Sequence, residues 1–140
     1  MKPDFTPLLK KLGVQFENPD LLIEAFTHRS FLNESNQRRP SNERLEFLGD
    51  AILSFIVSEH LYRSYPDATE GQLTNFRSTI VKTETLSLVS QRLDFGTYLF
   101  LSKGEEKGGG RQNYSLLADT FEAVLGALFL DGGLSRALAF

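Results

Sequence analysis

The most informative hydrophobic pattern in the chain lies between Asn42 and Ser64. On a helix with about 100° per residue, its acidic and hydroxyl positions fall within roughly 80° of arc. These positions are Glu43, Glu46, Asp50 and Ser54. The other positions from Leu45 to Val57 are almost all apolar. A helix that is apolar around most of its circumference is typically buried. The pattern therefore predicts a central helix that carries a row of carboxylates into the fold.

Caps, prolines and glycines predict further helices on both sides of this stretch. The expected helices are Pro3–Leu12, a helix opened by Asn18-Pro19-Asp20, Glu70–Val81 behind a Thr69/Gln72 capping box, Thr83–Leu93, Ser115–Leu130 stopped by Asp131-Gly132-Gly133, and a last one over Leu134–Phe140. Residues 33–41 and 104–111 are predicted to be loops, the second one flexible, and residues 94–101 fit either a turn or a short extended segment. No series of alternating strands is present, so the predicted fold class is all-α.

Composition favours one domain over residues 1–140, since 140 residues are enough to bury a substantial core. The chain has no cysteine, which excludes disulfides and thiolate metal sites. The longest apolar run, Ala123 to Leu130, is too short to span a membrane, and the N-terminus has no signal-peptide hydrophobic region. We therefore expect a cytoplasmic protein. The net charge of −3 argues against a nucleic-acid partner unless the chemistry of a site outweighs it.

A second apolar helix repeats the acidic anomaly of the first. Between Leu116 and Leu130 its only charged residues are Asp119 and Glu122, which share a face, and Gly126 is expected to leave that face open. If the two helices pack side by side, Glu46, Asp50, Asp119 and Glu122 converge. Two carboxylates at about 4 Å repel by roughly 4 kcal/mol at an effective dielectric near 20, so a cation is expected among them. An oxygen-only ligand set suits Mg²⁺ or Mn²⁺.

Other interpretations of these charges stay open. Each acidic pair can instead cap a helix, form salt bridges or face solvent. A di-iron bundle is excluded because it requires Glu-x-x-His, whereas Ala-Val-Leu follows Glu122. The histidines, His28 and His60, are best interpreted as structural. The basic side chains Arg38, Arg39, Lys107 and Arg111 are interpreted as solvated charges, with phosphate contact as the alternative.

The motifs resemble those of the ribonuclease III catalytic domain. The segment Glu43-Arg-Leu-Glu-Phe-Leu-Gly-Asp-Ala51 looks like the family signature. Three further segments support the resemblance in order and spacing: Thr27-His-Arg-Ser30, Glu70-Gly-Gln-Leu-Thr74 and Leu116-Leu-Ala-Asp-Thr-Phe-Glu-Ala123. The resemblance covers about Leu8 to Gly133. The resemblance does not extend to the double-stranded-RNA-binding domain that usually follows in the family. The chain is therefore expected to be a catalytic domain from a longer protein.

The resemblance implies a homodimeric, all-helical endonuclease that hydrolyses double-stranded RNA with Mg²⁺, leaving 5′-phosphates and short 3′ overhangs. It implies that Glu46, Asp50, Asp119 and Glu122 are the catalytic metal ligands, that Glu43 and Glu70 line the RNA cleft, and that Phe47 enters a pocket of the partner subunit. The alternative for Phe47 is a place in the core of its own subunit. The rival functions are a non-catalytic member of the same fold and a helical carboxylate metalloenzyme with a small-molecule substrate.

Overall fold

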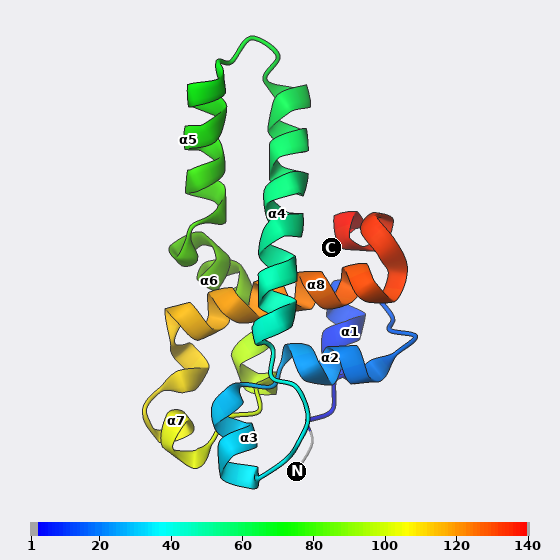
Figure 1. Ribbon diagram of the computed structural model, residues 1–140, viewed down its shortest axis with the longest axis vertical. Coiled ribbons are helices and arrows are strands. Elements are labelled where there is room, and N and C mark those ends of the chain that lie inside the picture. The colour runs from blue at the N-terminus through cyan, green and yellow to red at the C-terminus, as the bar shows by residue number, and fades with distance from the viewer. Residues whose placement is uncertain (1–2, 140) are drawn as a thin grey trace.

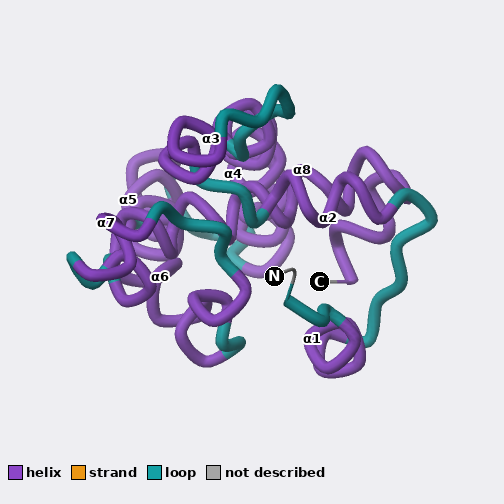
Figure 2. The backbone as a smooth tube through the Cα atoms, turned by 90° about the horizontal axis from the view of Figure 1, so that it is seen from below, coloured by secondary structure: helices purple, strands orange, loops and turns teal. Residues whose placement is uncertain are grey.

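The computed structural model describes residues 3–139, and this part of the chain is helical without a strand, which confirms the all-α prediction (Figures 1 and 2). Its elements are α1 (Thr6–Leu12), α2 (Pro19–Ala25), α3 (Arg29–Ser35), α4 (Glu43–Ser64), α5 (Glu70–Val81), α6 (Thr83–Arg92), η1 (Phe95–Tyr98), α7 (Lys103–Lys107), η2 (Gly110–Gln112) and α8 (Tyr114–Ala139). Within the described residues, no helix has both the length and the hydropathy needed to cross a membrane.

Two glycines let α4 and α8 cross in direct backbone contact, as Figure 1 shows near the lower end of α4. A Cβ added to Gly49 would overlap the carbonyl of Glu122, and one added to Gly126 would lie 2.5 Å from the carbonyl oxygen of Leu45. Only residues without a side chain permit this separation. The expectation that Gly126 leaves an open face is wrong, because the backbone of α4 occupies that space.

The hydrophobic core has two parts, one on each side of this crossing. One part gathers α1, α2, η1 and the middle of α8 around Phe26, which is fully buried and packs edge-on against Phe95 with ring centroids 5.3 Å apart. The other lies between α4, α6 and α8 and includes Ile52, Leu86 and Leu125. Burial of α4 and α8 from both sides explains why their sequences are apolar around most of the circumference.

The second half of α4 and all of α5 form a hairpin that projects from this body (Figure 1). The predicted capping box is confirmed: the Thr69 hydroxyl accepts from the Gln72 amide, and the Gln72 side chain accepts from the Thr69 amide. No residue of α5 is fully buried. Tyr65 and Phe76, with ring centroids 5.4 Å apart, join the two helices near the tip.

Two of the predicted loops are partly helical. The polar stretch 33–41 begins inside α3, and the stretch 104–111 contains parts of α7 and η2 rather than a flexible connector. Arg111 explains the second difference, because its guanidinium donates to the carbonyls of Gly96 and Leu99 and pairs with Glu106. Its side chain is therefore a structural clamp and not a free phosphate ligand.

Arg39 also differs from the expectation of a solvated charge. Its guanidinium lies 5.3 Å from the ring centroid of Phe31 and 4.9 Å from that of Phe100, so cation–π contacts hold it against the core. Residues 94–101, which fitted two alternatives, form the 3₁₀ turn η1 and one isolated parallel bridge between Phe100 and Thr27.

The predicted stop at residues 131–133 is confirmed, because a kink with non-helical backbone there divides α8 into two helical segments. Helix α8 turns at Gly133, where φ is 80° and ψ is −175°, a conformation that favours glycine. Asp131 fixes the kink: its carboxylate accepts from the amides of Glu17 and Asn18 and pairs with Arg136. The last predicted helix follows the kink as far as Ala139, and Phe140 lies outside the described residues.

Candidate metal centre and active site

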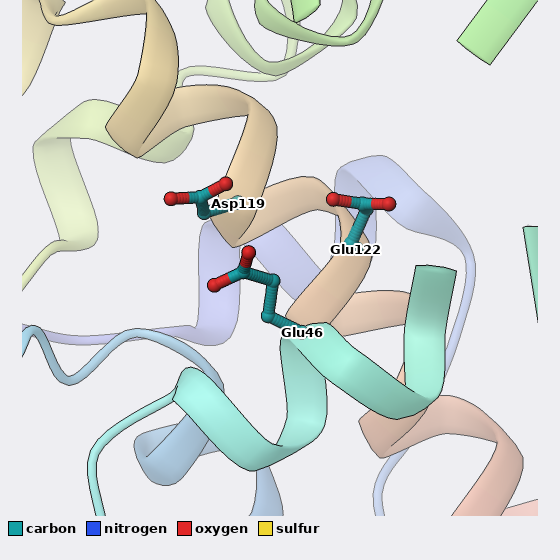
Figure 3. Close-up of side chains that lie close together, drawn as sticks. All are labelled: Glu46, Asp119 and Glu122. Carbon is teal, nitrogen blue, oxygen red and sulfur yellow. The ribbon is translucent and has the colours of Figure 1, made fainter. Parts of the chain in front are cut away.

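The crossing of α4 and α8 brings carboxylates from both helices together. One carboxylate oxygen from each of Glu46, Asp119 and Glu122 lies within 4.8 Å of the other two. Figure 3 shows the three side chains gathered at the crossing, Glu46 rising from α4 and the other two extending from α8. All three are half-buried. This convergence was predicted from the two acidic pairs, and the structure confirms it for these three residues.

Asp50, the fourth predicted ligand, lies at the edge of the group. Its side chain is exposed, and it is not among the three residues whose oxygens converge most closely. It nevertheless lies close to Glu122, whose pKa is raised first by burial and then by a hydrogen bond to Asp50 and by the negative charge of Asp50. Asp50 is therefore placed to complete an oxygen-only set from the solvent side.

The ionised forms of the clustered carboxyl groups are disfavoured in the absence of a cation, as their raised pKa values indicate. Burial, followed by a hydrogen bond to Asp50 and repulsion from the neighbouring carboxylates, raises the pKa of Glu122 to about 8. Burial and the negative charge of Asp119 raise the pKa of Glu46 to about 7. Burial also raises the pKa of Asp119. In each case the charged form is disfavoured by burial and, for the two glutamates, by like charges.

This donor set fits a hard divalent cation. Carboxylate oxygens from two rigid helices converge, they repel one another without an ion, and the described residues add no sulfur or histidine nitrogen to the group. Mg²⁺ and Mn²⁺ prefer such ligands, whereas Zn²⁺ usually takes nitrogen or sulfur. Glu46, Asp119 and Glu122 would hold the ion, with Asp50 beside them.

A polar cavity of about 220 Å³ opens on the α3 side of the cluster and shares Glu46 and Asp119 with it. Its remaining lining comes from His28, Arg29, Asn42, Glu43 and Leu116. Glu43 is exposed and lies 3.9 Å from the guanidinium of Arg29. Glu43 therefore lies beside the acidic cluster, and its role as an accessory residue of an RNA cleft stays a prediction.

Glu70 does not reach the cluster of its own chain. It opens α5 at the far tip of the hairpin, and the 18 residue steps of α4 from Glu46 to Ser64 span about 27 Å. Phe47 is also outside the cluster and has 82% of its surface exposed. The alternative that Phe47 fills the core of its own subunit is therefore wrong.

Sequence reasoning missed the role of His28 in the local structure. Its Nδ1 caps α3 by accepting from the Ser30 amide at 3.2 Å, a position more often held by Ser, Thr, Asp or Asn. The structural interpretation of His28 is thus confirmed, but its place on the cavity wall was not foreseen. Histidine is not one of the usual capping residues, so the sequence did not predict this cap. The one available indication was the position of His28 two residues before Ser30.

The raised pKa values predict a pH effect on the metal-free protein. Between the ordinary glutamate pKa of 4.5 and the folded values of about 7 and 8, the folded state binds more protons than the unfolded state. Stability should therefore fall as pH rises through this window, and cation binding, which displaces these protons, should strengthen. Thermal melts in chelator and in Mg²⁺ from pH 5 to pH 8 should diverge increasingly. A Glu46→Ala/Asp119→Ala double variant should lose the Mg²⁺-dependent shift, and an equal shift in both proteins would place the ion elsewhere.

Comparisons with known proteins agree with the motifs. The sequence profile of the family described as Ribonuclease-III-like matches residues 18–140. A protein named Ribonuclease 3 from a Roseiflexus species is 49% identical over 143 residues, covering 100% of this chain and 60% of the relative. Ribonuclease 3 of Borreliella burgdorferi is 44% identical, covering 99% of this chain and 57% of that protein. The chain thus spans about 60% of the length of these curated relatives.

Solved structures show the same fold. The nuclease domain of ribonuclease III from Campylobacter jejuni, described for structural flexibility in a region involved in dimer formation, matches with a TM-score of 0.90 and 35% identity. The match covers 96% of this chain and 91% of that one. Dicer from Pichia stipitis matches with a TM-score of 0.62 and 31% identity, over 86% of this chain and 50% of that protein.

Proposed function

Because the chain belongs to the ribonuclease III family, we propose that it is the catalytic domain of a metal-dependent endoribonuclease that cuts double-stranded RNA. The expected products carry 5′-phosphates and short 3′ overhangs. The observation that supports this proposal most strongly is the convergence of Glu46, Asp119 and Glu122, with Asp50 alongside, at the rigid crossing of α4 and α8. A non-catalytic member of the fold would have no need to retain this costly arrangement of charge.

The catalytic roles follow from the carboxylates and their support. A divalent ion held there would supply Lewis-acid activation of water and would neutralise charge on the leaving oxygen. Glu46 and Asp50 are held by α4, and Asp119 and Glu122 by α8, so contact between the backbones fixes their separation. Half-burial keeps Glu46, Asp119 and Glu122 partly out of bulk water, which strengthens their attraction for a cation.

The same ion reconciles an acidic domain with an RNA substrate. A net charge of −3 repels phosphate at long range, whereas a cation within the cluster would make the local potential favourable for phosphate. We therefore expect cleavage to require Mg²⁺, with Mn²⁺ able to replace it.

Incubation of the protein with a perfect RNA duplex, with Mg²⁺ and with chelator, tests the function directly. We expect cutting only with the ion, at both strands, with 5′-phosphate ends. Binding without cutting would identify a non-catalytic member of the fold. Inertness towards RNA of any form, together with Mg²⁺ binding at the cluster, would favour the small-molecule metalloenzyme.

We further propose that the domain works as a homodimer through an apolar stripe on α4. Phe47, Ala51, Phe55 and Tyr62 are all exposed and lie within about 80° of arc on one face of this helix. An exposed stripe of this kind next to an acidic site is typical of a contact surface. In a dimer, Glu70 at the tip of the hairpin can approach a catalytic cluster only as a residue of the partner subunit.

Replacement of Phe47 by alanine tests the dimer. With 82% of the side chain exposed, the change should cost little stability in the monomer, but it removes the largest apolar contact of the stripe. The sedimentation profile should shift from dimer toward monomer, with a loss of about tenfold or more in association. Leu88→Ala is the matched control, because Leu88 is also exposed but lies on α6. A Phe47→Ala protein that stays fully dimeric would remove this residue from the interface.

Duplex binding by this domain alone should be weak and only shallowly dependent on salt. Of the four basic side chains predicted as possible phosphate contacts, Arg39 and Arg111 are engaged within the fold, which leaves Arg38 and Lys107. A protein making six to ten phosphate contacts loses about 10³–10⁵ in affinity between 50 and 200 mM salt. With so few contacts, the loss here should be far smaller, while cleavage fades towards physiological salt. Activity persisting at high salt would reveal a larger RNA-binding surface.

A further inference from the structure

His28 occupies a defined position at the junction of α3 and the acidic site. It is the N-cap residue of α3, and its ring lines the cavity that also contains Glu46 and Asp119. Its Nδ1 accepts from the Ser30 amide at 3.2 Å and contacts the Ser30 hydroxyl at 2.7 Å. One ring nitrogen therefore serves the fold, and the other is left for a different partner.

These contacts determine which nitrogen carries the proton in the neutral ring. A nitrogen that accepts from a backbone amide cannot bear a hydrogen in the same direction, so Nδ1 is the acceptor and Nε2 carries the N–H. The Ser102 amide donates to the oxygen of the Ser30 hydroxyl at 3.1 Å, so the hydrogen of this hydroxyl is available for donation to Nδ1. Within residues 3–139, Nε2 has no hydrogen-bond partner.

Further hydrogen bonds hold Ser30, the partner of the His28 ring, in place. Ser102 caps α7 by accepting from the Glu105 amide, and the Lys103 amide donates to Glu34 on α3. Helices α3 and α7 are thus joined through hydrogen bonds that include the partner of His28. A ring held from one edge in this way is preorganised to donate from the other edge.

The cavity is lined by two chemically different kinds of side chain. Glu43, Glu46 and Asp119 supply carboxylates to the lining, and His28 and Arg29 supply N–H donors. Arg29 lies 3.9 Å from Glu43, and His28 is close enough to Asp119 for their charges to interact. A phosphodiester group can use both kinds of side chain, since its oxygens can meet both a cation held by the carboxylates and N–H donors. We propose that the Nε2–H of His28 donates a hydrogen bond to a backbone phosphate of the RNA beside the cleaved bond. This inference rests on the proposed function and adds a substrate-positioning residue to it.

Two substitutions separate the two nitrogens of His28. In His28→Asn the side-chain oxygen replaces Nδ1 as the cap of α3, and nothing reaches the position of Nε2. In His28→Gln the longer side chain returns an N–H donor near the position of Nε2, but it is a poorer cap. His28→Asn should keep the melting temperature and lose about tenfold or more in kcat/KM on duplex RNA, and His28→Gln should melt lower yet recover much of the cleavage.

Duplex affinity in Ca²⁺ and Mg²⁺-induced stabilisation complete the test. His28→Asn should weaken duplex binding while leaving the stabilisation by Mg²⁺ unchanged, because the metal ligands are intact. His60→Asn is the matched control, since His60 is exposed on the hairpin and should behave as wild type. Wild-type cleavage and binding by His28→Asn would overturn the proposal and leave the ring a helix cap. Loss of the Mg²⁺ response in this variant would also overturn it. Failure of the wild-type protein to cut duplex RNA would instead refute the proposed function.

Discussion

Replacing Glu122 with glutamine is expected to lower the rate of duplex RNA cleavage by about 10³-fold or more. Glutamine keeps the shape of the side chain but removes one negative ligand from a cluster that must hold a divalent ion. A Lewis-acidic ion contributes several kcal/mol to a transition state, and each 1.36 kcal/mol is tenfold in rate. Single-turnover cleavage of a defined duplex at saturating Mg²⁺ measures the effect on chemistry apart from substrate binding.

The Glu122→Gln variant should keep or gain stability although it loses activity. Burial and the neighbouring carboxylates raise the pKa of Glu122 to about 8, so its ionised form destabilises the metal-free fold. Glutamine cannot ionise, and the variant in chelator at pH 8 should therefore melt no lower than wild type. A loss of activity together with a lower melting temperature would point to damaged folding instead of a lost ligand.

Glu24→Gln is the matched control for this substitution. Glu24 is also half-buried, and burial raises its pKa too, but it lies on α2 and takes no part in the cluster. The control should cut RNA at the wild-type rate. If Glu122→Gln cut as well as Glu24→Gln, the assignment of Glu122 as a metal ligand would be wrong.

The sequence was sufficient to predict the fold class, the two central helices and the carboxylates they carry. Glu46 and Asp119 are recognisable because a charge within an apolar helix is anomalous, and this depends only on local pattern. The capping box at Thr69 is equally local and was predicted correctly. Such features can be predicted from the sequence because their physical cause lies within one turn of helix.

Features that depend on packing between distant segments were not predictable in this way. Arg111 looks like an exposed base in a glycine-rich stretch, and only the carbonyls of Gly96 and Leu99 reveal it as a clamp. Arg39 is likewise defined by two aromatic rings from different parts of the chain. The distance of Glu70 from the cluster follows from the length of α4, which the motif itself does not convey.

Gly49→Ala, which adds a single methyl group to α4, is expected to lower the stability of the fold strongly. The new Cβ would occupy the position of the Glu122 carbonyl, so the backbones of α4 and α8 must separate. Overpacking of a well-packed core typically costs about 1–3 kcal/mol and occasionally more, and contact with a backbone that cannot rotate away places this change at the upper end. For a domain of this size, each kcal/mol lowers the melting temperature by about 4 °C.

Separation of the helices should also impair catalysis, because Glu46 and Asp50 move with α4 while Asp119 and Glu122 stay on α8. Gly49→Ala should therefore lose both thermal stability and the Mg²⁺-dependent rise in melting temperature, although no carboxylate has changed. Gly71→Ala is the matched control: its Cβ would meet only the Thr69 hydroxyl at 4.0 Å, and alanine in an exposed helix is favoured by up to about 1 kcal/mol over glycine. A Gly49→Ala protein with the stability and Mg²⁺ response of the control would show that the glycine contact does not position the metal site.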